Sequence, residues 1–134
     1  MNQTEPNKAL IRAHYDSAAN AYRPSVIERQ VAADFVDHGE PALAGPEGVK
    51  AQTRALRAAF PDLTVTIEDL VAEGDLVAVR ATWRGTHQGP FRGVPPIGRK
   101  VEFSGMVFWR IGGGQIRERW GLIDTPSLMR QLQG

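Results

Sequence analysis

The sequence contains no cysteine, which excludes disulfide bonds, thiolate nucleophiles and cysteine-based metal sites. It has only three histidines, and no two of them have the spacing of a helical metal-ligand pair, so no metal is expected. There is no run of about 18 apolar residues and no apolar segment behind the N-terminus, so the sequence predicts neither a membrane span nor a signal peptide. We therefore expect a cytoplasmic protein.

Charge of one sign is also lacking. Sixteen basic and fifteen acidic residues give a net charge of +1, and the basic residues are scattered. This pattern offers no surface for nucleic acid or for an anionic membrane. No glycine-rich phosphate loop lies between a strand and a helix, because Gly112, Gly113 and Gly114 are expected in a hairpin turn, and no serine lies in a nucleophile elbow. We expect no cofactor.

What the chain does have is enough apolar material for one domain, residues 1–134. Hydrophobic residues make up 42% of the sequence. A chain of this length buries roughly two-thirds of its unfolded surface. These numbers are typical of an ordinary globular protein.

Three alternating runs, separated by turns rich in glycine and proline, predict an antiparallel meander of the strands Val77–His87, Val101–Ile111 and Gln115–Leu122. In each run, alternate residues share one face of the strand. The sets that share a face are Val77, Val79, Ala81, Trp83 and His87; Val101, Phe103, Val107 and Trp109; and Ile116, Glu118, Trp120, Leu122 and Asp124.

Helical patterns come mainly before these strands. We expect helices at Lys8–Ala21 with Asn7 as the cap, Ser25–Ala33, Pro46–Phe60 and from Thr125 to Gln133, a short extended piece at Asp34–Gly39, and a strand from Leu63 with a bulge near Asp69–Val71. This order predicts an α+β fold with helices on one face of an antiparallel sheet.

The ordered set of motifs resembles the SnoaL-like polyketide cyclase (ester cyclase) family. The matching segments are Phe35–Gly39, Gly45–Gly48, Ala59–Asp62, Gly85–Gly89, Gly93–Arg99, Gly114–Ile116, Glu118–Trp120 and Leu128–Leu132. The resemblance implies a nuclear-transport-factor-2-like, cystatin-like α+β roll. In it, a cone-shaped curved antiparallel sheet wraps on about three N-terminal helices around a deep apolar pocket.

The resemblance also implies a chemistry. Cyclases of this family close a polyketide ring by intramolecular aldol addition, with an Asp and a His on the last two strands as the proton-transfer pair. Gly121 and Val107 stand at those two positions here, and Asp37 stands nearest to a third polar position. The framework is therefore kept while the proton-transfer pair is replaced.

His87 is the first catalytic candidate, because it ends an otherwise apolar strand face and a histidine can exchange protons near neutral pH. We expect a carboxylate partner, Asp37 in preference to Asp124. The alternative is that His87 only ties down the following loop. Asp37 and His38 are adjacent, so only one of them can face the pocket.

The other candidates also carry alternatives. Asp124 is either a pocket carboxylate or the cap of the last helix. Arg119 either binds an anionic or carbonyl oxygen in the pocket or is exposed. The remaining expected ligand-binding residues are Trp120, Val107, Gly121, Tyr15 and Phe103.

Two functions remain open. One is a cofactor-independent cyclase, isomerase or hydratase that acts on a small, apolar, oxygenated, polyketide-like molecule by proton transfer. The other is a non-catalytic binding module of the same fold. Met106 and Phe108 leave apolar groups on the second face of their strand, so we expect a homodimer through the sheet.

Overall fold

The computed structural model describes residues 3–133, in which most of the helices precede a run of strands. The elements are α1 (Thr4–Tyr15), a π-helical continuation η1 (Asp16–Asn20), α2 (Pro24–Gln30), β1 (Val31–Asp37), α3 (Gly45–Ala59), β2 (Thr64–Glu73), β3 (Leu76–Thr86), β4 (Lys100–Gly112), β5 (Gln115–Ile123) and α4 (Thr125–Gln133). The predicted α+β class is confirmed.

The boundaries of the first two helices differ from the sequence prediction. Asn7 is not a cap but lies buried inside α1, which begins at Thr4. The second helix ends at Gln30, and Val31 to Ala33, predicted to be helical, begin β1 instead. Pairing with the sheet outweighs local helix propensity here, because Val31 is buried opposite Ile116 of β5.

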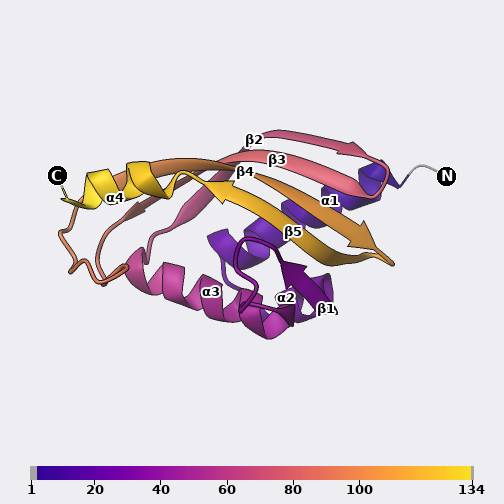
Figure 1. Ribbon diagram of the computed structural model, residues 1–134, viewed down its shortest axis with the longest axis horizontal. Coiled ribbons are helices and arrows are strands. Elements are labelled where there is room, and N and C mark those ends of the chain that lie inside the picture. The colour runs from indigo at the N-terminus through magenta and orange to yellow at the C-terminus, as the bar shows by residue number, and fades with distance from the viewer. Residues whose placement is uncertain (1–2, 134) are drawn as a thin grey trace.

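The strands form one curved sheet in the order β1-β5-β4-β3-β2. The pairs β3–β4 and β4–β5 are antiparallel, as the meander predicted, and β2 pairs with β3 in the same way. β1 pairs with β5 in parallel, so the sheet is mixed rather than wholly antiparallel. This last pairing brings the early extended piece beside β5, the last strand of the chain (Figure 1).

Besides a register shift between Val31 and Val36 of β1, two others shape the sheet. The first lies between Ile67 and Asp69 of β2, close to the predicted bulge. The second, which the sequence analysis did not predict, lies between Arg110 and Ile111 of β4. It leaves Arg117 of β5 without a register partner, so the residues after it change faces.

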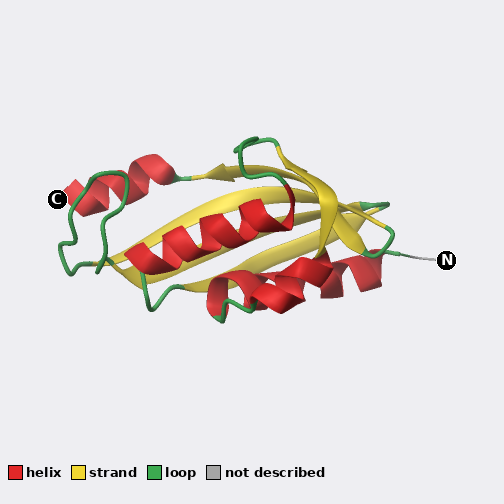
Figure 2. Ribbon diagram, turned by 90° about the horizontal axis from the view of Figure 1, so that it is seen from below, coloured by secondary structure: helices red, strands yellow, loops and turns green. Residues whose placement is uncertain are grey.

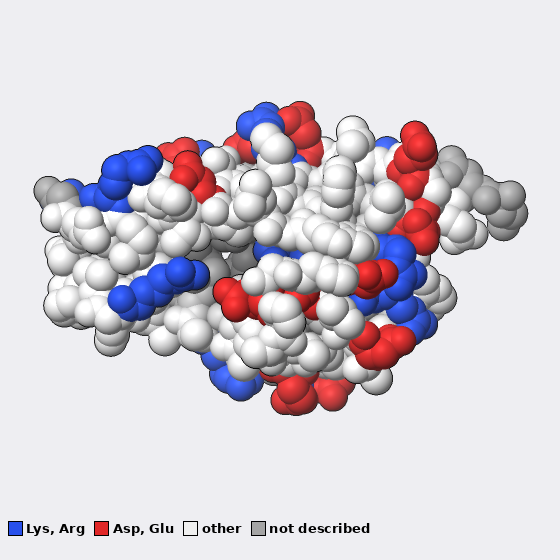
Figure 3. All heavy atoms as spheres, viewed as in Figure 1, with Lys and Arg blue, Asp and Glu red and all other residues white. Residues whose placement is uncertain are grey.

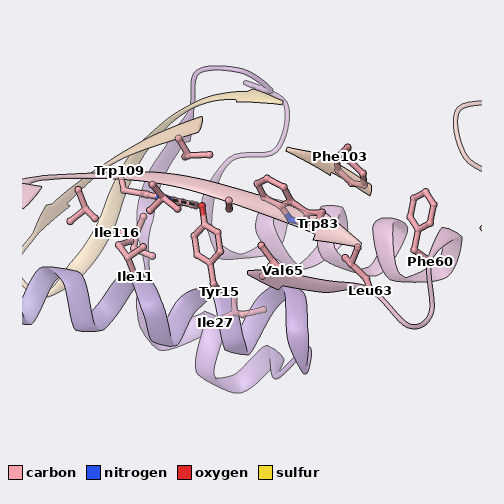
Figure 4. Close-up of a cluster of buried hydrophobic side chains, with 14 of the residues drawn as sticks. Ile11, Tyr15, Ile27, Phe60, Leu63, Val65, Trp83, Phe103, Trp109 and Ile116 are labelled. Atoms are coloured by element: carbon pink, nitrogen blue, oxygen red, sulfur yellow. Dashed lines mark hydrogen bonds between the residues drawn. The ribbon is translucent and has the colours of Figure 1, made fainter. Parts of the chain in front are cut away.

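The helices α1, α2 and α3 cover one face of the sheet, and Figure 2 shows α1 and α3 lying across it. The residues of β3 and β4 that share the predicted phases form the sheet side of this core and are almost fully buried. Figure 4 shows Tyr15 rising from α1 toward Trp109, with Trp83, Phe103 and Phe60 following along the core. Among residues 3–133, no helix is long and apolar enough to cross a membrane.

Candidate functional site

A buried ion pair joins the two strands at the parallel edge of the sheet. Arg119 of β5 lies opposite Asp37 of β1 in the register. Its Nη1 donates to both carboxylate oxygens of Asp37, at 3.1 Å to Oδ2 and 3.3 Å to Oδ1. The Asp37 side chain is only 3% exposed and that of Arg119 is 15% exposed. The pair therefore lies on the helix-covered side of the sheet.

Asp37 is also held by the chain that follows it. Its Oδ1 accepts hydrogen bonds from the backbone N–H groups of Gly39 (2.9 Å) and Glu40 (3.2 Å). Three of the four contacts therefore fall on Oδ1, and only the Arg119 bond reaches Oδ2. Oδ2 keeps a lone pair that no described residue uses.

Gly121 and Trp109 determine where the Arg119 guanidinium lies. A Cβ added at Gly121 would stand 2.6 Å from Cζ, Nη1 and Nη2 of Arg119 alike, so the flat face of the guanidinium rests against this glycine. The Cζ atom lies 5.5 Å from the centre of the Trp109 ring. A cation over an aromatic face is electrostatically favourable. Any side chain at position 121 would have to displace the guanidinium.

Tyr15 and His14 of α1 complete the polar cluster. Trp109 Nε1 donates to Tyr15 Oη at 3.4 Å, and among the described residues nothing accepts the phenolic proton. Burial raises the pKa of Tyr15 to about 12, so the phenol keeps its proton. Burial also lowers the pKa of His14 to about 4, against the opposing effect of a 3.0 Å contact between Nδ1 and Gln30 Oε1. His14 is therefore a neutral structural group.

His87 lies far from this cluster, so the predicted His87–Asp37 pair is not formed. In the sheet, Asp37 lies opposite Arg119, and Arg119 lies opposite Trp109 of β4. His87 directly follows Thr86, which lies opposite Lys100 at the start of β4. Nine residues of β4 separate Trp109 from Lys100, which corresponds to about 30 Å of strand. The shared strand phase was correctly predicted, but a shared phase places residues on one face without making them neighbours.

The surroundings of His87 are apolar. Its side chain is fully buried against Phe60, with ring centres 5.6 Å apart, and neither ring nitrogen has a partner among the described residues. The main chain of His87 does hold the following loop, because its N–H donates to Arg99 O and its carbonyl accepts from Gly98 N–H.

The other candidates lie on different surfaces. His38 points to the outer face, opposite to Asp37, and stacks on Trp120 at 4.8 Å between ring centres. Glu118 approaches His38 Nε2 at 2.8 Å and accepts a hydrogen bond from Arg110; both contacts hold the pKa of Glu118 below its usual value.

Asp124 is exposed and accepts the Ser127 N–H at 3.1 Å, which caps α4.

Of the remaining predicted lining residues, Val107 and Phe103 are buried on the inner face with Tyr15. Figure 3 shows the molecule hollowed near the centre of one face, between the sheet above and α3 below. An apolar depression of about 650 Å³ lies instead on the outer face of the sheet, where Met106, Phe108 and Leu122 are exposed. Among the described residues, no group of three or more metal-ligating side chains comes together.

The cluster was only partly visible in the sequence. Arg119 was left with two alternatives because the bulge at Arg117 could not be foreseen. Trp109 and His14 are polar or aromatic groups in otherwise apolar patterns, but such a pattern does not distinguish a polar cluster from an ordinary core. Gln30 gave no signal, since it lies in a short helix predicted to run past it.

Comparison with known proteins supports the family. The family model described as SnoaL-like polyketide cyclase matches residues 9–132. No curated protein sequence matches the chain.

Three solved structures have the same fold over nearly the whole chain. AclR from Streptomyces galilaeus, a proposed hydroxylase, is 29% identical with a TM-score of 0.85, covering 96% of this chain and 82% of its own. IdmH from Streptomyces antibioticus, a proposed polyketide cyclase, is 31% identical with a TM-score of 0.83, covering 96% and 99%. A proposed SnoaL-like polyketide cyclase from Jannaschia sp. is 26% identical with a TM-score of 0.90, covering 100% and 96%.

The mixed, curled sheet, its helices on one face and the match over residues 9–132 lead to one conclusion: the chain belongs to the SnoaL-like polyketide cyclase family.

Proposed function

We propose that the protein is a proton-transfer enzyme of the cyclase, isomerase or hydratase type that acts on a small, oxygenated, polyketide-like molecule. The observation that carries the proposal is the buried Asp37 carboxylate, held in place by Arg119. The Arg119 guanidinium lies over the Trp109 ring, which hydrogen-bonds Tyr15, and the phenolic proton of Tyr15 has no acceptor among residues 3–133. The name of IdmH, a proposed polyketide cyclase, supports a polyketide-like substrate.

The chemistry begins with proton abstraction next to a carbonyl group. Asp37 Oδ2 takes the proton from the carbon, and the C–H electron pair moves into the carbonyl to form an enolate. The Tyr15 hydroxyl donates to the enolate oxygen and stabilises its charge. The enolate carbon then adds to a second carbonyl, whose oxygen takes the proton held by Asp37. In an isomerisation Asp37 returns the proton to a different carbon of the conjugated enolate instead. Atoms and electrons balance without a cofactor.

Arg119 has a supporting role in this scheme. Its cation offsets the charge of the buried carboxylate, since an isolated charge in an apolar interior would be strongly disfavoured. The two backbone N–H groups of Gly39 and Glu40 fix the orientation of the carboxylate. His87 takes no part in this mechanism.

Hydrogen–deuterium exchange of a model ketone tests the proposal. 2-Tetralone, a bicyclic ketone with acidic C–H bonds, is followed by NMR in D₂O. We expect the protein to accelerate exchange. The exchange rate with Asp37→Asn should be lower than with the wild type by about 10²–10⁴-fold. Glu73→Gln, which removes an exposed carboxylate at the end of β2, is the matched control and keeps the full rate.

The alternative, a binding module without turnover, has its own outcome in the same experiment. It is supported if 2-tetralone binds, as seen by chemical-shift changes, while exchange stays at the rate of buffer. An Asp37→Asn protein that is folded and exchanges at the wild-type rate refutes the role of Asp37.

We also propose that the outer face of the sheet is the contact between two copies. Its large apolar side chains are 54–82% exposed at Val71, Met106, Phe108 and Leu122. Asp69 and Arg80 border the same depression and pair with each other at 2.6 Å, so these two side chains leave no net charge that would repel a second copy. A monomer rarely exposes so much apolar surface in one place.

A further inference from the structure

The guanidinium of Arg119 has an edge that forms no hydrogen bond with residues 3–133. An arginine offers five N–H donors, two on each Nη and one on Nε. Only Nη1 makes hydrogen bonds in the described part of the chain, both of them to Asp37. Nε and Nη2 therefore present three N–H groups with no partner there, on a side chain that is 15% exposed.

The free edge is held in a fixed orientation. Gly121 lies against the face of the guanidinium, the Trp109 ring lies 5.5 Å from Cζ, and Asp37 holds Nη1. A planar fork fixed in this way matches a planar group that presents two oxygens side by side, because each oxygen accepts one N–H in a bidentate pair. A single ketone oxygen or an ester carbonyl leaves one donor unmatched.

We propose that Arg119 binds a planar two-oxygen anion of the ligand, a carboxylate or the enolate of a 1,3-dicarbonyl, through its Nε–Nη2 edge. The inference rests on the proposed function in using the same site, but it concerns binding and not turnover. It narrows the substrate class from oxygenated molecules in general to those that carry, or ionise to, such a group.

Charge balance sets the size of the effect. Asp37 already offsets the positive charge of Arg119, so the discrimination comes from two short charge-assisted hydrogen bonds and not from an excess of positive charge. Hydrogen bonds of this kind are about twice as strong as neutral ones. We expect a preference of roughly tenfold for an acid over its methyl ester, rather than several orders of magnitude.

Calorimetric binding of matched probes tests the inference. The probes are 2-naphthoate, methyl 2-naphthoate as the neutral analogue, and benzoylacetone at pH values below and above its ionisation. The wild type is expected to bind 2-naphthoate about tenfold more tightly than the ester. Benzoylacetone should bind more tightly once ionised. Binding by only one of the two anions identifies which source the site accepts.

Two variants remove the fork in different ways. Arg119→Lys keeps the charge but has no planar edge. Gly121→Ala keeps the arginine but places a Cβ where the guanidinium lies. Both should reduce the preference for 2-naphthoate to about twofold or less and leave ester binding unchanged. Arg117→Lys is the matched control, because this neighbour on β5 pairs with exposed Asp34, and it should keep the preference.

Several results would overturn the inference: equal binding of acid and ester by the wild type, binding of neither at millimolar concentration, or an unchanged preference in both fork variants. The hydrogen–deuterium exchange experiment tests the proposed function separately. Preference for the acid without hydrogen–deuterium exchange supports an anion site without catalysis, and exchange without the preference supports catalysis without the anion site.

Discussion

Position 121 illustrates how a missing side chain positions a charge. The resemblance places the acid–base aspartate of the cyclases there, and this chain has glycine. The space is filled by the guanidinium of Arg119, a residue that lies two positions before Gly121 on the same strand. A carboxylate is still present in the cluster, but it comes from Asp37 on the neighbouring strand.

The two buried histidines, His14 and His87, allow a second test at the level of single residues. His87→Leu removes two ring nitrogens that have no partner among residues 3–133, so no hydrogen bond is lost. We expect the free energy of unfolding to stay within about 1 kcal/mol of the wild type or to rise. His14→Leu is the control. It leaves the buried Gln30 amide without its 3.0 Å partner, which should cost about 1–3 kcal/mol.

Urea unfolding of both variants measures this difference. A large loss of stability in His87→Leu would show that the imidazole makes a bond that the structure does not contain. The histidine would then be the one that ties down the Gln88–Lys100 loop, which was the alternative left open by the sequence.

At the scale of the element, the first turn of α3 is determined by packing against the loop that follows β1. A Cβ added at Gly48 would lie 2.1 Å from the carbonyl carbon of Leu43. This loop begins with Gly39 and Glu40, whose N–H groups hold Asp37. The close approach of α3 therefore supports the position of the proposed base.

Gly48→Ala should therefore destabilise the protein, although alanine has a higher helix propensity than glycine. In an unconstrained helix the change gains up to about 1 kcal/mol. Here we expect a loss of about 1–3 kcal/mol, because backbone atoms have to move apart. Thermal unfolding measures it, with Ala55→Gly at an exposed position of α3 as the reference for propensity alone, at a cost of about 1 kcal/mol. A stabilised Gly48→Ala protein would contradict the packing argument.

At the scale of the whole molecule, the sheet has one face covered by helices and one that carries exposed apolar groups. Leu122 is 82% exposed on that open face. We predict that the wild type is a dimer at micromolar concentration in multi-angle light scattering. Leu122→Glu should be a folded monomer, since an unpaired charge is costly inside an apolar contact.

Ile97→Glu is the matched change for this test. Ile97 is a 44% exposed apolar residue in the loop after β3, outside the residues that border the depression. This variant should remain a dimer. A monomeric wild type, or a Leu122→Glu variant that stays dimeric, would exclude this face as the contact.

Local patterns in the sequence were enough to predict the phases of β3 and β4, the last hairpin turn and the order of most helices before the strands. The predicted single face for Ile116, Trp120 and Leu122 of β5 was wrong. Val77, Val79, Trp83, Phe103 and Trp109 are buried as their alternation predicted, because period-two alternation is a local property of a strand. The adjacent Asp37 and His38 point to opposite faces for the same reason.

Which of these residues come into contact depends on the tertiary structure. The bulge leaves Arg117 without a partner in the register of β4 and β5. As a result Ile116 lies on the inner face, Trp120 and Leu122 lie on the outer face, and Arg119 points inward. The parallel pairing of β1 with β5 then places Asp37 beside Arg119, 82 residues later in the chain. Register and pairing are long-range properties that depend on how the whole sheet closes against the helices, and no local pattern encodes them.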